Sequence, residues 1–375
     1  QLIVQNGVPI HKELPRDAND VDRLPEGDLF KISMNAFVHN CIDLDGARGI
    51  SDDQFNNLQI QPGRLMWIFS YKMAESTYKP HARLVFNDTR SMSAFDEITF
   101  SNVAKQISWK LVIHYTLLQG GELARWDIKS AHQTVRRGPD TAPCVTYAIP
   151  GVTIRLGGGT RANYVLWSNM LNGMPPAGAG FSKDLKAHLA HFKDGLLPTL
   201  QDDYVYVWFS ATGAFLYVCV IVDDLIIGYK GCKTITNKQL ITDLQTHIET
   251  KYVLKLLDFN GLLNNQVYRD VPERRITLTM ETRLTEMMHE FLPEEVIGSS
   301  APATPCHPEI RLLHQQTDRL EGVDKEVAHR LCAKLLYAVV QVYYYAQYPV
   351  FYCARYTHKP SQLYKACLLY ALRHL

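Results

Sequence analysis

Two adjacent carboxylates, Asp223 and Asp224, stand in the middle of the apolar stretch "LYVCVIVDDLIIGYK", which covers residues 216–230. The residues around the acids are mostly Val, Ile, Leu and Tyr, which favour packed strands. Acids between two buried strands must either face solvent or have a charged partner. The stretch therefore predicts a β-hairpin that carries two carboxylates at its tip.

A plain turn and a metal site are both compatible with this hairpin. Asp is a good turn residue, but a two-residue turn favours Asn-Gly or Asp-Gly because its central residues prefer positive φ. Two neighbouring carboxylates also repel each other unless a cation lies between them. Mg²⁺ binds carboxylate oxygens and completes its shell with water and substrate phosphates. The acid pair thus predicts a divalent-metal site, and the plain turn is the alternative.

A third acid, Asp127, stands well upstream in "ARWDIKSAH", where an apolar and aromatic run predicts a strand that ends at the acid. One carboxylate from a strand end and two from a hairpin tip can converge on two metal ions. Such an arrangement suits in-line phosphoryl or nucleotidyl transfer, because paired metals stabilise both the attacking and the leaving oxygen.

The composition is that of an ordinary globular protein of about two or three domains, with 375 residues, 46% hydrophobic and 21% charged. No apolar run reaches the ~18 residues of a membrane span, and no signal peptide is visible. The eight cysteines include no C-x-x-C pair, which favours free thiols in a reducing compartment over a zinc module.

A net charge of +1 argues against strong non-specific binding of nucleic acid but is compatible with a local basic groove. Seven basic side chains concentrate in one half of the chain, and they could equally be scattered over its surface. They are Arg64, Lys72, Lys79, His81, Arg83, Arg136 and Arg137.

Apolar periodicity predicts a chain in which helices and strands intermix. Residues 1–60 are polar and predict a loop-rich extension, whereas residues 299–310 predict a Pro-rich linker. The predicted strands cover 65–73, 81–88, 143–151, 164–171, 202–210, 214–222, 257–263 and 274–280, and another starts near 122. The predicted helices cover 101–119 with Ser101 as N-cap, 179–196, 238–254, 282–292, 324–347 and 361–375. We expect the tyrosines at 343–345 to pack in a core rather than to stack on bases.

Several motifs together resemble the reverse transcriptase of copia-type (Ty1/copia) retrotransposons in a divergent form. "HARLVFND" is similar to the family's fingers motif, "WDIKSAH" to its Asp-Val-Lys-x-Ala-Phe segment, and "CVTYAIPG" to the segment that follows. "MLNGMPPAGAGF" is similar to the Leu-Tyr-Gly block, "VIVDDLIIG" to the Tyr-Val-Asp-Asp hairpin, and "LDFNGLL" with "RRITLTMETRLTEMM" to the primer-grip strand and the elements after it. The motifs keep their order and approximate spacing from about residue 60 to the C-terminus.

The resemblance implies an α+β, right-hand polymerase fold of fingers, palm and thumb, with an antiparallel palm sheet and a helical C-terminal tail. The implied bounds are an N-terminal extension at 1–60, fingers at 61–122, and a palm at 123–265 that includes a fingers insertion at about 150–200. A thumb at 266–345 and the start of a connection-like tail at 346–375 would follow. We expect no RNase H, integrase or protease region.

The resemblance also implies site residues. Two Mg²⁺ ions, or Mn²⁺, would be held by Asp127, Asp223, Asp224 and the carbonyl of Ile128. Arg83 would bind the triphosphate of the incoming dNTP, since a guanidinium can grip phosphate with two hydrogen bonds. His132 would lie against the ribose 2′ position, and Asn172 and Gly173 against the nucleotide and template. The primer end would be held by Phe259, Asn260 and Gly261.

The chain departs from the family pattern at several of these positions. His132 replaces a Phe, which affects discrimination between sugars, and His81 replaces a common Lys, which weakens triphosphate binding at neutral pH. Ile221 and Asn172 stand where the family has Tyr. The Arg-Pro-Asp signature is missing from "YYYAQYPVFYCARY".

The leading hypothesis is an RNA-directed DNA polymerase that acts on an RNA or DNA primer-template, in a cytoplasmic virus-like particle or in the nucleus. The alternative is a domesticated reverse-transcriptase fold that serves as a structural or nucleic-acid-binding subunit of a larger assembly or a dimer. Retention of all three acids favours the enzyme, because buried like charges without a metal would cost several kcal/mol. The departures from the family motifs and the near-neutral net charge favour the hypothesis of a structural subunit. A template-independent nucleotidyl transferase is a third possibility.

Overall fold

The computed structural model describes residues 2–5, 8–74, 77–87, 102–138, 143–174, 176–263, 265–270 and 272–375. The chain forms two compact units, one from Glu13 to Asp258 and one from Phe259 to Leu375 that also includes Leu2–Lys12. The fold is mixed α+β, and the strands within the described ranges pair antiparallel. No helix within the described ranges is both long enough and apolar enough to span a membrane.

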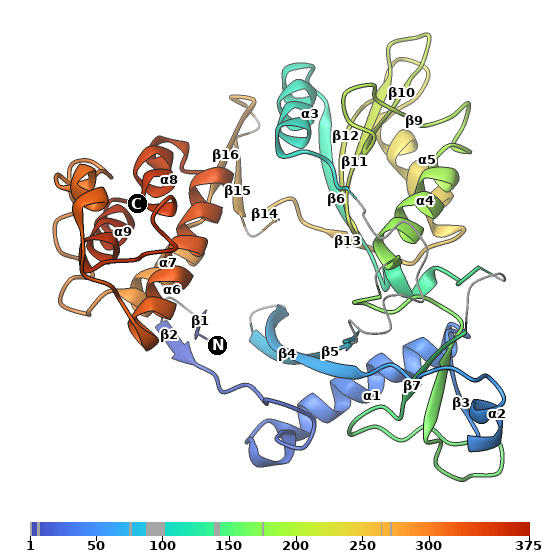
Figure 1. Cartoon of the computed structure of the whole chain (residues 1–375). Coiled ribbons are helices and arrows are strands. Elements are labelled where there is room, and N and C mark those ends of the chain that lie inside the picture. The colour runs from blue at the N-terminus through green and yellow to red at the C-terminus, as the bar shows by residue number, and fades with distance from the viewer. Residues whose placement is uncertain are drawn as a thin grey trace. The chain divides into compact units, whose positions relative to one another are not determined.

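A six-stranded sheet is the centre of the first unit (Figure 1). Its strands, in spatial order, are β13 (Leu254–Leu257), β6 (Glu122–Ile128), β12 (Asp224–Lys230), β11 (Phe215–Ile221), β10 (Val205–Phe209) and β9 (Leu197–Pro198). Nearly every side chain of β11 and β12 is buried, which explains their unbroken apolar sequence. The predicted hairpin of buried strands around the acids is confirmed.

Three helices cover this sheet: α3 (Gln106–Leu118), α4 (Ala177–Leu189) and α5 (Asn237–Glu249). Helix α3 packs against β6, β11 and β12, and α5 packs against β12 and β13. The close approach of α3 depends on Gly228, because a Cβ there would collide with Thr116.

Helix α3 begins later than predicted, and the predicted N-cap, Ser101, lies outside the described residues. Lys105 precedes the helix and has no side-chain cap; instead, its amide donates to the Asp202 carboxylate at 2.8 Å. A carboxylate from a distant part of the chain thus anchors the residue that precedes the helix.

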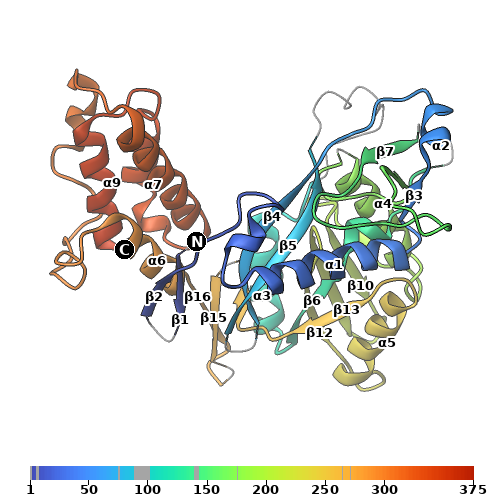
Figure 2. The same cartoon turned by 90° about the horizontal axis from the view of Figure 1, so that it is seen from below.

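The β-hairpin of β4 (Leu65–Ala74) and β5 (Thr77–Phe86) packs on α1 (Gly27–Asp43), which lies across it in Figure 2. The ring of Phe30 contacts both Phe69 and Tyr71 edge-on, with ring centroids 5.4 and 5.5 Å apart. The expectation that residues 1–60 are loop-rich is wrong, because α1 is a 17-residue helix. Its buried residues Phe30, Met34, Val38 and Cys41 recur at helical spacing.

A smaller sheet completes the first unit. It consists of β3 (Ala47–Ile50), β8 (Tyr164–Trp167) and β7 (Cys144–Tyr147), beside the short helix α2 (Asp52–Asn56). Among its described residues are the 3₁₀ helices η1 (Val21–Arg23) and η3 (Ala131–Thr134).

The second unit joins a small sheet, a short hairpin and a helical cluster. Its strands are β1 (Leu2–Gln5), β2 (Val8–His11), β14 (Gly261–Leu262), β15 (Asn265–Asp270) and β16 (Arg275–Thr279). Its helices are α6 (Glu281–Phe291), η4 (Ile310–Gln315), α7 (Gly322–Gln341), η5 (Tyr344–Ala346), α8 (Gln347–Ala354) and α9 (Gln362–His374). The chain forms α7, α8 and α9 where two helices were predicted.

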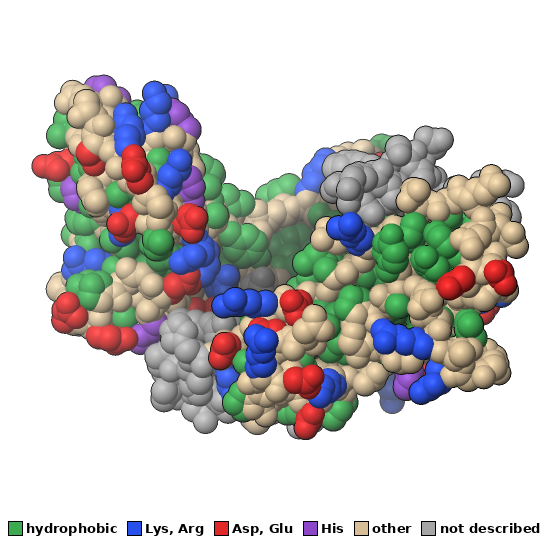
Figure 3. Space-filling view, turned by 60° about the horizontal axis from the view of Figure 1, so that its bottom comes forward, with side chains coloured by type: hydrophobic (Ala, Val, Ile, Leu, Met, Phe, Trp, Pro, Cys, Tyr) green, Lys and Arg blue, Asp and Glu red, His purple; other side chains and the backbone are tan. Residues whose placement is uncertain are grey.

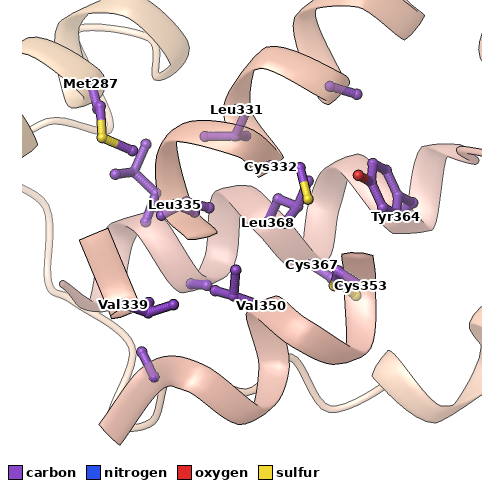
Figure 4. Close-up of a cluster of buried hydrophobic side chains, with 14 of the residues drawn as sticks. Met287, Leu331, Cys332, Leu335, Val339, Val350, Cys353, Tyr364, Cys367 and Leu368 are labelled. Carbon is purple, nitrogen blue, oxygen red and sulfur yellow. The ribbon is translucent and has the colours of Figure 1, made fainter. Parts of the chain in front are cut away.

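Side chains from α6, α7, α8 and α9 form the core of the second unit (Figure 4). Leu335, Val350 and Leu368 are completely buried there, and Cys353 and Cys367 are almost completely buried. All eight cysteines of the chain are free, as predicted.

The expectation of core packing for the tyrosine cluster is wrong for two of its three members. Tyr343 is half-buried and its hydroxyl accepts a hydrogen bond from the Met280 amide at 3.0 Å. Tyr344 and Tyr345 are 75% and 53% exposed. Acidic and basic side chains are interspersed on the visible face of each unit (Figure 3), as the net charge of +1 indicates.

Candidate functional site

The hairpin that carries the acid pair turns one residue earlier than the sequence predicts. Ile221 pairs with Asp224, so the two central residues of the turn are Val222 and Asp223. Asp224 is the first residue of β12 rather than part of the tip. Val222 has a φ of 58°, which is unfavourable for a β-branched residue. The chain therefore holds the tip in a strained conformation.

Asp127 meets this hairpin at the end of β6. It pairs directly with Asp224, and the amide of the next residue, Ile128, donates to the carbonyl of Asp223 at 2.9 Å. Burial, followed by the nearby charges of Asp223 and Asp224, raises the pKa of Asp127. The three acids predicted to converge are thus brought together, and the amide of Ile128 fixes their relative position.

Arg125 is a close cationic partner that sequence reasoning missed. Its Nε and Nη2 donate to Oδ1 of Asp224 at 3.1 and 2.8 Å, and both side chains are 19% exposed. The residue opposite Arg125 on β12 is Ile226, so Arg125 and Asp224 are diagonal neighbours on one face of the sheet. The strand register alone reveals this pair, and the sequence gives no sign of it.

Two lysines also approach the acids. Lys255 of β13 pairs with Asp127, and its charge acts against the rise in the pKa of Asp127. Lys72 of β4 is close enough for Asp127 and Asp223 to favour its charged form, although burial and then Arg83 lower its pKa overall. Anionic and cationic side chains therefore meet at this end of the sheet.

A cavity of about 550 Å³ opens beside the hairpin tip. It is lined by four residues assigned to nucleotide binding, namely Arg83, His132, Asn172 and Gly173, and by Val222 from the tip itself. Its other walls are mainly apolar and come from β4, β5, α4 and the end of β11. Residues that are far apart in the sequence thus share one cavity adjacent to the acids.

The floor of this cavity requires a glycine. Gly173 has a φ of +86°, and a Cβ at this position would lie 2.5 Å from the carbonyl oxygen of Phe86. The Phe86 amide donates to the carbonyl of Asn172 at 2.8 Å. The 172–173 loop and the end of β5 are therefore joined backbone to backbone.

His132 presents an imidazole to the cavity in its neutral form. Burial lowers its pKa, and the ring packs edge-on against Phe181 at 6.1 Å. Its Nδ1 is buried with no hydrogen-bond partner among the described atoms. A ligand with a hydroxyl group could satisfy this nitrogen.

An amide network that the sequence did not reveal supports the turn around His132. Asn40 of α1 donates to Gln133 at 2.7 Å and to Ser130 at 3.0 Å. Asn169 donates to the carbonyl of Gln133 at 2.7 Å. These side chains hold η3, and with it the imidazole, against α1.

The β4–β5 hairpin has one apolar face and one basic face. The apolar face packs on α1, whereas Lys72, Lys79, His81 and Arg83 share the other face because side chains alternate along a strand. Burial, followed by the charges of Lys72 and Arg83, lowers the pKa of His81 to about 4. Four of the seven basic residues noted in the sequence thus gather on one face.

The residues assigned to the primer end lie in the second unit. Phe259 is buried, the carbonyl of Asn260 accepts from the Val267 amide at 2.8 Å, and Gly261 pairs with Gln266. Their role at the primer end stays a prediction.

The donor types at the acid cluster fit Mg²⁺, which prefers carboxylate and carbonyl oxygens. Over the described ranges, however, no group of three or more His, Cys, Asp or Glu side chains has a metal-binding arrangement. In this conformation Oδ1 of Asp224 accepts hydrogen bonds from Arg125. A metal held by all three acids would therefore have to compete with that guanidinium.

No protein-family model matches the chain, and a comparison with curated proteins gives no match. The resemblance to copia-type reverse transcriptases thus depends on the motifs quoted above and on where their residues lie.

Proposed function

We propose that the chain is an RNA-directed DNA polymerase that transfers nucleotides from dNTPs to a primer 3′-hydroxyl. The observation that carries the proposal is the meeting of Asp127, Asp223 and Asp224 beside the cavity lined by Arg83 and His132. A carboxylate cluster next to a nucleotide-sized cavity is the arrangement that metal-assisted nucleotidyl transfer requires.

Each residue at the site has a role under this proposal. Asp127, Asp223, Asp224 and the Ile128 carbonyl would hold two Mg²⁺ ions, or Mn²⁺, which when bound lower the pKa of the primer hydroxyl and neutralise the leaving pyrophosphate. The Arg83 guanidinium would bind the triphosphate.

The remaining wall residues would position the substrate. His132 would contact the sugar through its unpartnered Nδ1. The glycine at 173 would leave room for the nucleotide and template beside Asn172, and the loop of Phe259, Asn260 and Gly261 would contact the primer end.

The finer fold assignment belongs to the same proposal. The six-stranded sheet would be the palm, the β4–β5 hairpin with the β3–β8–β7 sheet would be the fingers, and the helices of the second unit would be the thumb and the start of the tail. An antiparallel sheet with acids at its strand ends supports this assignment.

The Arg125–Asp224 pair favours a second candidate function. A guanidinium on one of the three acids can replace a metal as the neutralising charge, and the cluster would then be stable without catalysis. Such a chain would serve as a structural or nucleic-acid-binding subunit of a larger assembly.

Primer extension separates the two candidates. The polymerase extends a DNA primer on an RNA template with dNTPs and Mg²⁺, and Asp223→Asn abolishes extension because it removes one metal-binding charge. The matched control, Asp53→Asn, removes an exposed carboxylate on α2 and retains full activity. If the wild-type chain incorporates no dNTP with Mg²⁺ or Mn²⁺, the subunit candidate replaces the polymerase.

A further inference from the structure

An exposed aromatic surface covers one side of α8 in the second unit. Tyr348 and Phe351 are 58% and 45% exposed, and Tyr352 and Arg355 lie on the same side of the helix at spacings of three and four residues. The opposite side carries Val350 and Cys353, which are buried in the core. An outward helix face is usually polar, so three aromatic rings there indicate a binding function.

The rings on this face form a ladder. The centroids of Tyr348 and Tyr352 are 6.0 Å apart, and those of Tyr352 and Tyr356 are 5.6 Å apart. The guanidinium carbon of Arg355 lies 5.7 Å from the Tyr352 ring centroid. The ladder thus offers successive aromatic faces and one cation to a ligand with flat rings.

The surrounding chain has an unusual charge. Residues 327–375 contain six Lys or Arg and no Asp or Glu. Three of the six are paired with acids that lie earlier in the chain, since Glu290 accepts from Arg330 and Lys334, and Asp324 accepts from Lys365. Arg355 and Lys359 form no ion pair within the part of the chain that the structure describes.

A basic cavity follows the ladder in the sequence. Two residues after Tyr356, the chain enters a cavity of about 410 Å³ that includes His358 and Lys359. Arg319 and Lys325 line the same cavity, whose single acid among its lining residues is Glu321. The cavity that begins two residues after the last ring of the ladder is therefore lined by more basic than acidic side chains.

We propose that this surface binds single-stranded nucleic acid, with unpaired bases stacked on Tyr348, Tyr352 and Tyr356 and a phosphate at the cavity of Lys325 and Lys359. Base stacking on aromatic side chains is tolerant of sequence, and nearby cations add affinity for the backbone. A single strand matches the rings and the positive charge together, because its bases are flat and its phosphates are anionic. The inference does not depend on polymerase activity.

Fluorescence anisotropy of the full chain with labelled oligo-uridylate and oligo-deoxythymidylate tests the proposal, in EDTA and without dNTP. The double variant Tyr348→Ala/Tyr352→Ala is expected to weaken binding by about tenfold or more, the scale of lost stacking. Tyr348→Phe/Tyr352→Phe keeps the rings and is expected to bind within about threefold of wild type. Comparison of the two oligonucleotides distinguishes RNA from DNA.

Three controls sharpen this experiment. Phe209→Ala removes a 54% exposed aromatic ring of the first unit and should leave binding unchanged. Lys359→Gln should weaken binding and reduce its salt dependence, because one phosphate contact is lost. Asp53→Asn removes an exposed carboxylate on α2 and should also bind normally. Because the assay contains EDTA and no dNTP, loss of this surface is distinguishable from loss of catalysis.

Two results would overturn the proposal. One is that the double Ala variant binds both oligonucleotides as tightly as the wild type does. The other is an equal loss in the Phe variant, which would make the aromatic rings irrelevant. Circular dichroism of each variant ensures that a weakened signal does not come from unfolding.

Discussion

The guanidinium of Arg125 binds Asp224, the acid that pairs across the sheet with Asp127. One cationic side chain is therefore already in place where a metal would bind. We expect Arg125→Gln to strengthen the binding of divalent metal by about tenfold, since a hydrogen bond to a charged group contributes about 1.5–3 kcal/mol. Mn²⁺ titration followed by electron paramagnetic resonance measures this affinity.

The same substitution should also lower the free energy of unfolding by about 1–3 kcal/mol, because it leaves a largely buried carboxylate unpaired. Lys193→Gln breaks the Lys193–Asp243 ion pair at another surface of the first unit and serves as the control. If Arg125→Gln loses stability without any gain in metal affinity, the pair is structural and the acids do not form a metal site.

His132→Phe should raise selectivity for dNTP over rNTP in primer extension. Phe removes the buried Nδ1 that lacks a partner, and with it the group that could hydrogen-bond to a ribose 2′-hydroxyl. The ratio of incorporation rates for the two sugars is the measurement, with the exposed residue His191 changed to Phe as the control. An unchanged ratio would remove His132 from sugar discrimination.

Gly173→Ala should lower the free energy of unfolding by about 1–3 kcal/mol, because Ala disfavours positive φ and its Cβ would collide with the Phe86 carbonyl. Urea titration provides the value. Gly158→Ala is the matched control, since nothing lies within 4 Å of a Cβ at that position. Equal stability of the two variants would show that the loop and β5 are not closely joined.

Asp202→Ala should destabilise the protein at neutral pH by about 1–3 kcal/mol, because the amides of Lys105 and Tyr204 lose their acceptor. Burial alone would raise the pKa of Asp202, but hydrogen bonds from Ser108, Lys105 and Tyr204 lower it below its usual 3.8. Because the pKa of Asp202 is lower in the folded protein than in the unfolded chain, its ionised carboxylate stabilises the fold at any pH above the unfolded pKa. This stabilisation is lost as the pH falls through the pKa of the folded protein.

The difference in stability between Asp202→Ala and wild type should therefore be largest at neutral pH and shrink below about pH 4. Urea titrations across this range measure it. The neighbouring exposed residue, changed as Asp203→Ala, should show little effect. A constant difference at all pH values would contradict the assignment of charged Asp202 as the acceptor.

Cys232 should be the most reactive thiol near neutral pH. Hydrogen bonds with Thr212 and Thr234, both at 3.1 Å, lower its pKa from 9.0 to about 6, whereas burial raises that of Cys41 to about 12. Iodoacetamide labelling followed by mass spectrometry should show that the alkylation rate of Cys232 reaches half its maximum at about pH 6. The variant Thr212→Val/Thr234→Val should move this midpoint to higher pH. A midpoint that does not move would show that the two threonines do not lower the pKa of Cys232.

The sequence predicted the buried hairpin correctly but placed its turn one residue too late. The apolar runs around Asp223 and Asp224 leave no alternative to buried strands, but periodicity does not show which two residues turn. Helix α1 was missed because apolar residues outside the buried face, such as Ile32, obscure the helical spacing of Phe30, Met34 and Val38. The Arg125–Asp224 pair depends on how β6 and β12 align, and only the folded sheet supplies that alignment.

The hydrogen bond from Phe86 to Asn172 has a further consequence for motion. It fixes the base of the β4–β5 hairpin to the wall of the cavity. The amide of Ala82 donates to the hydroxyl of Ser33 on α1 at 2.9 Å, and the hydroxyl of Tyr71, farther along the hairpin, donates to the Glu26 carboxylate. The hairpin is thus attached at its base, its middle and its outer part, so Arg83 has a fixed place beside the cavity and does not sit on a mobile arm.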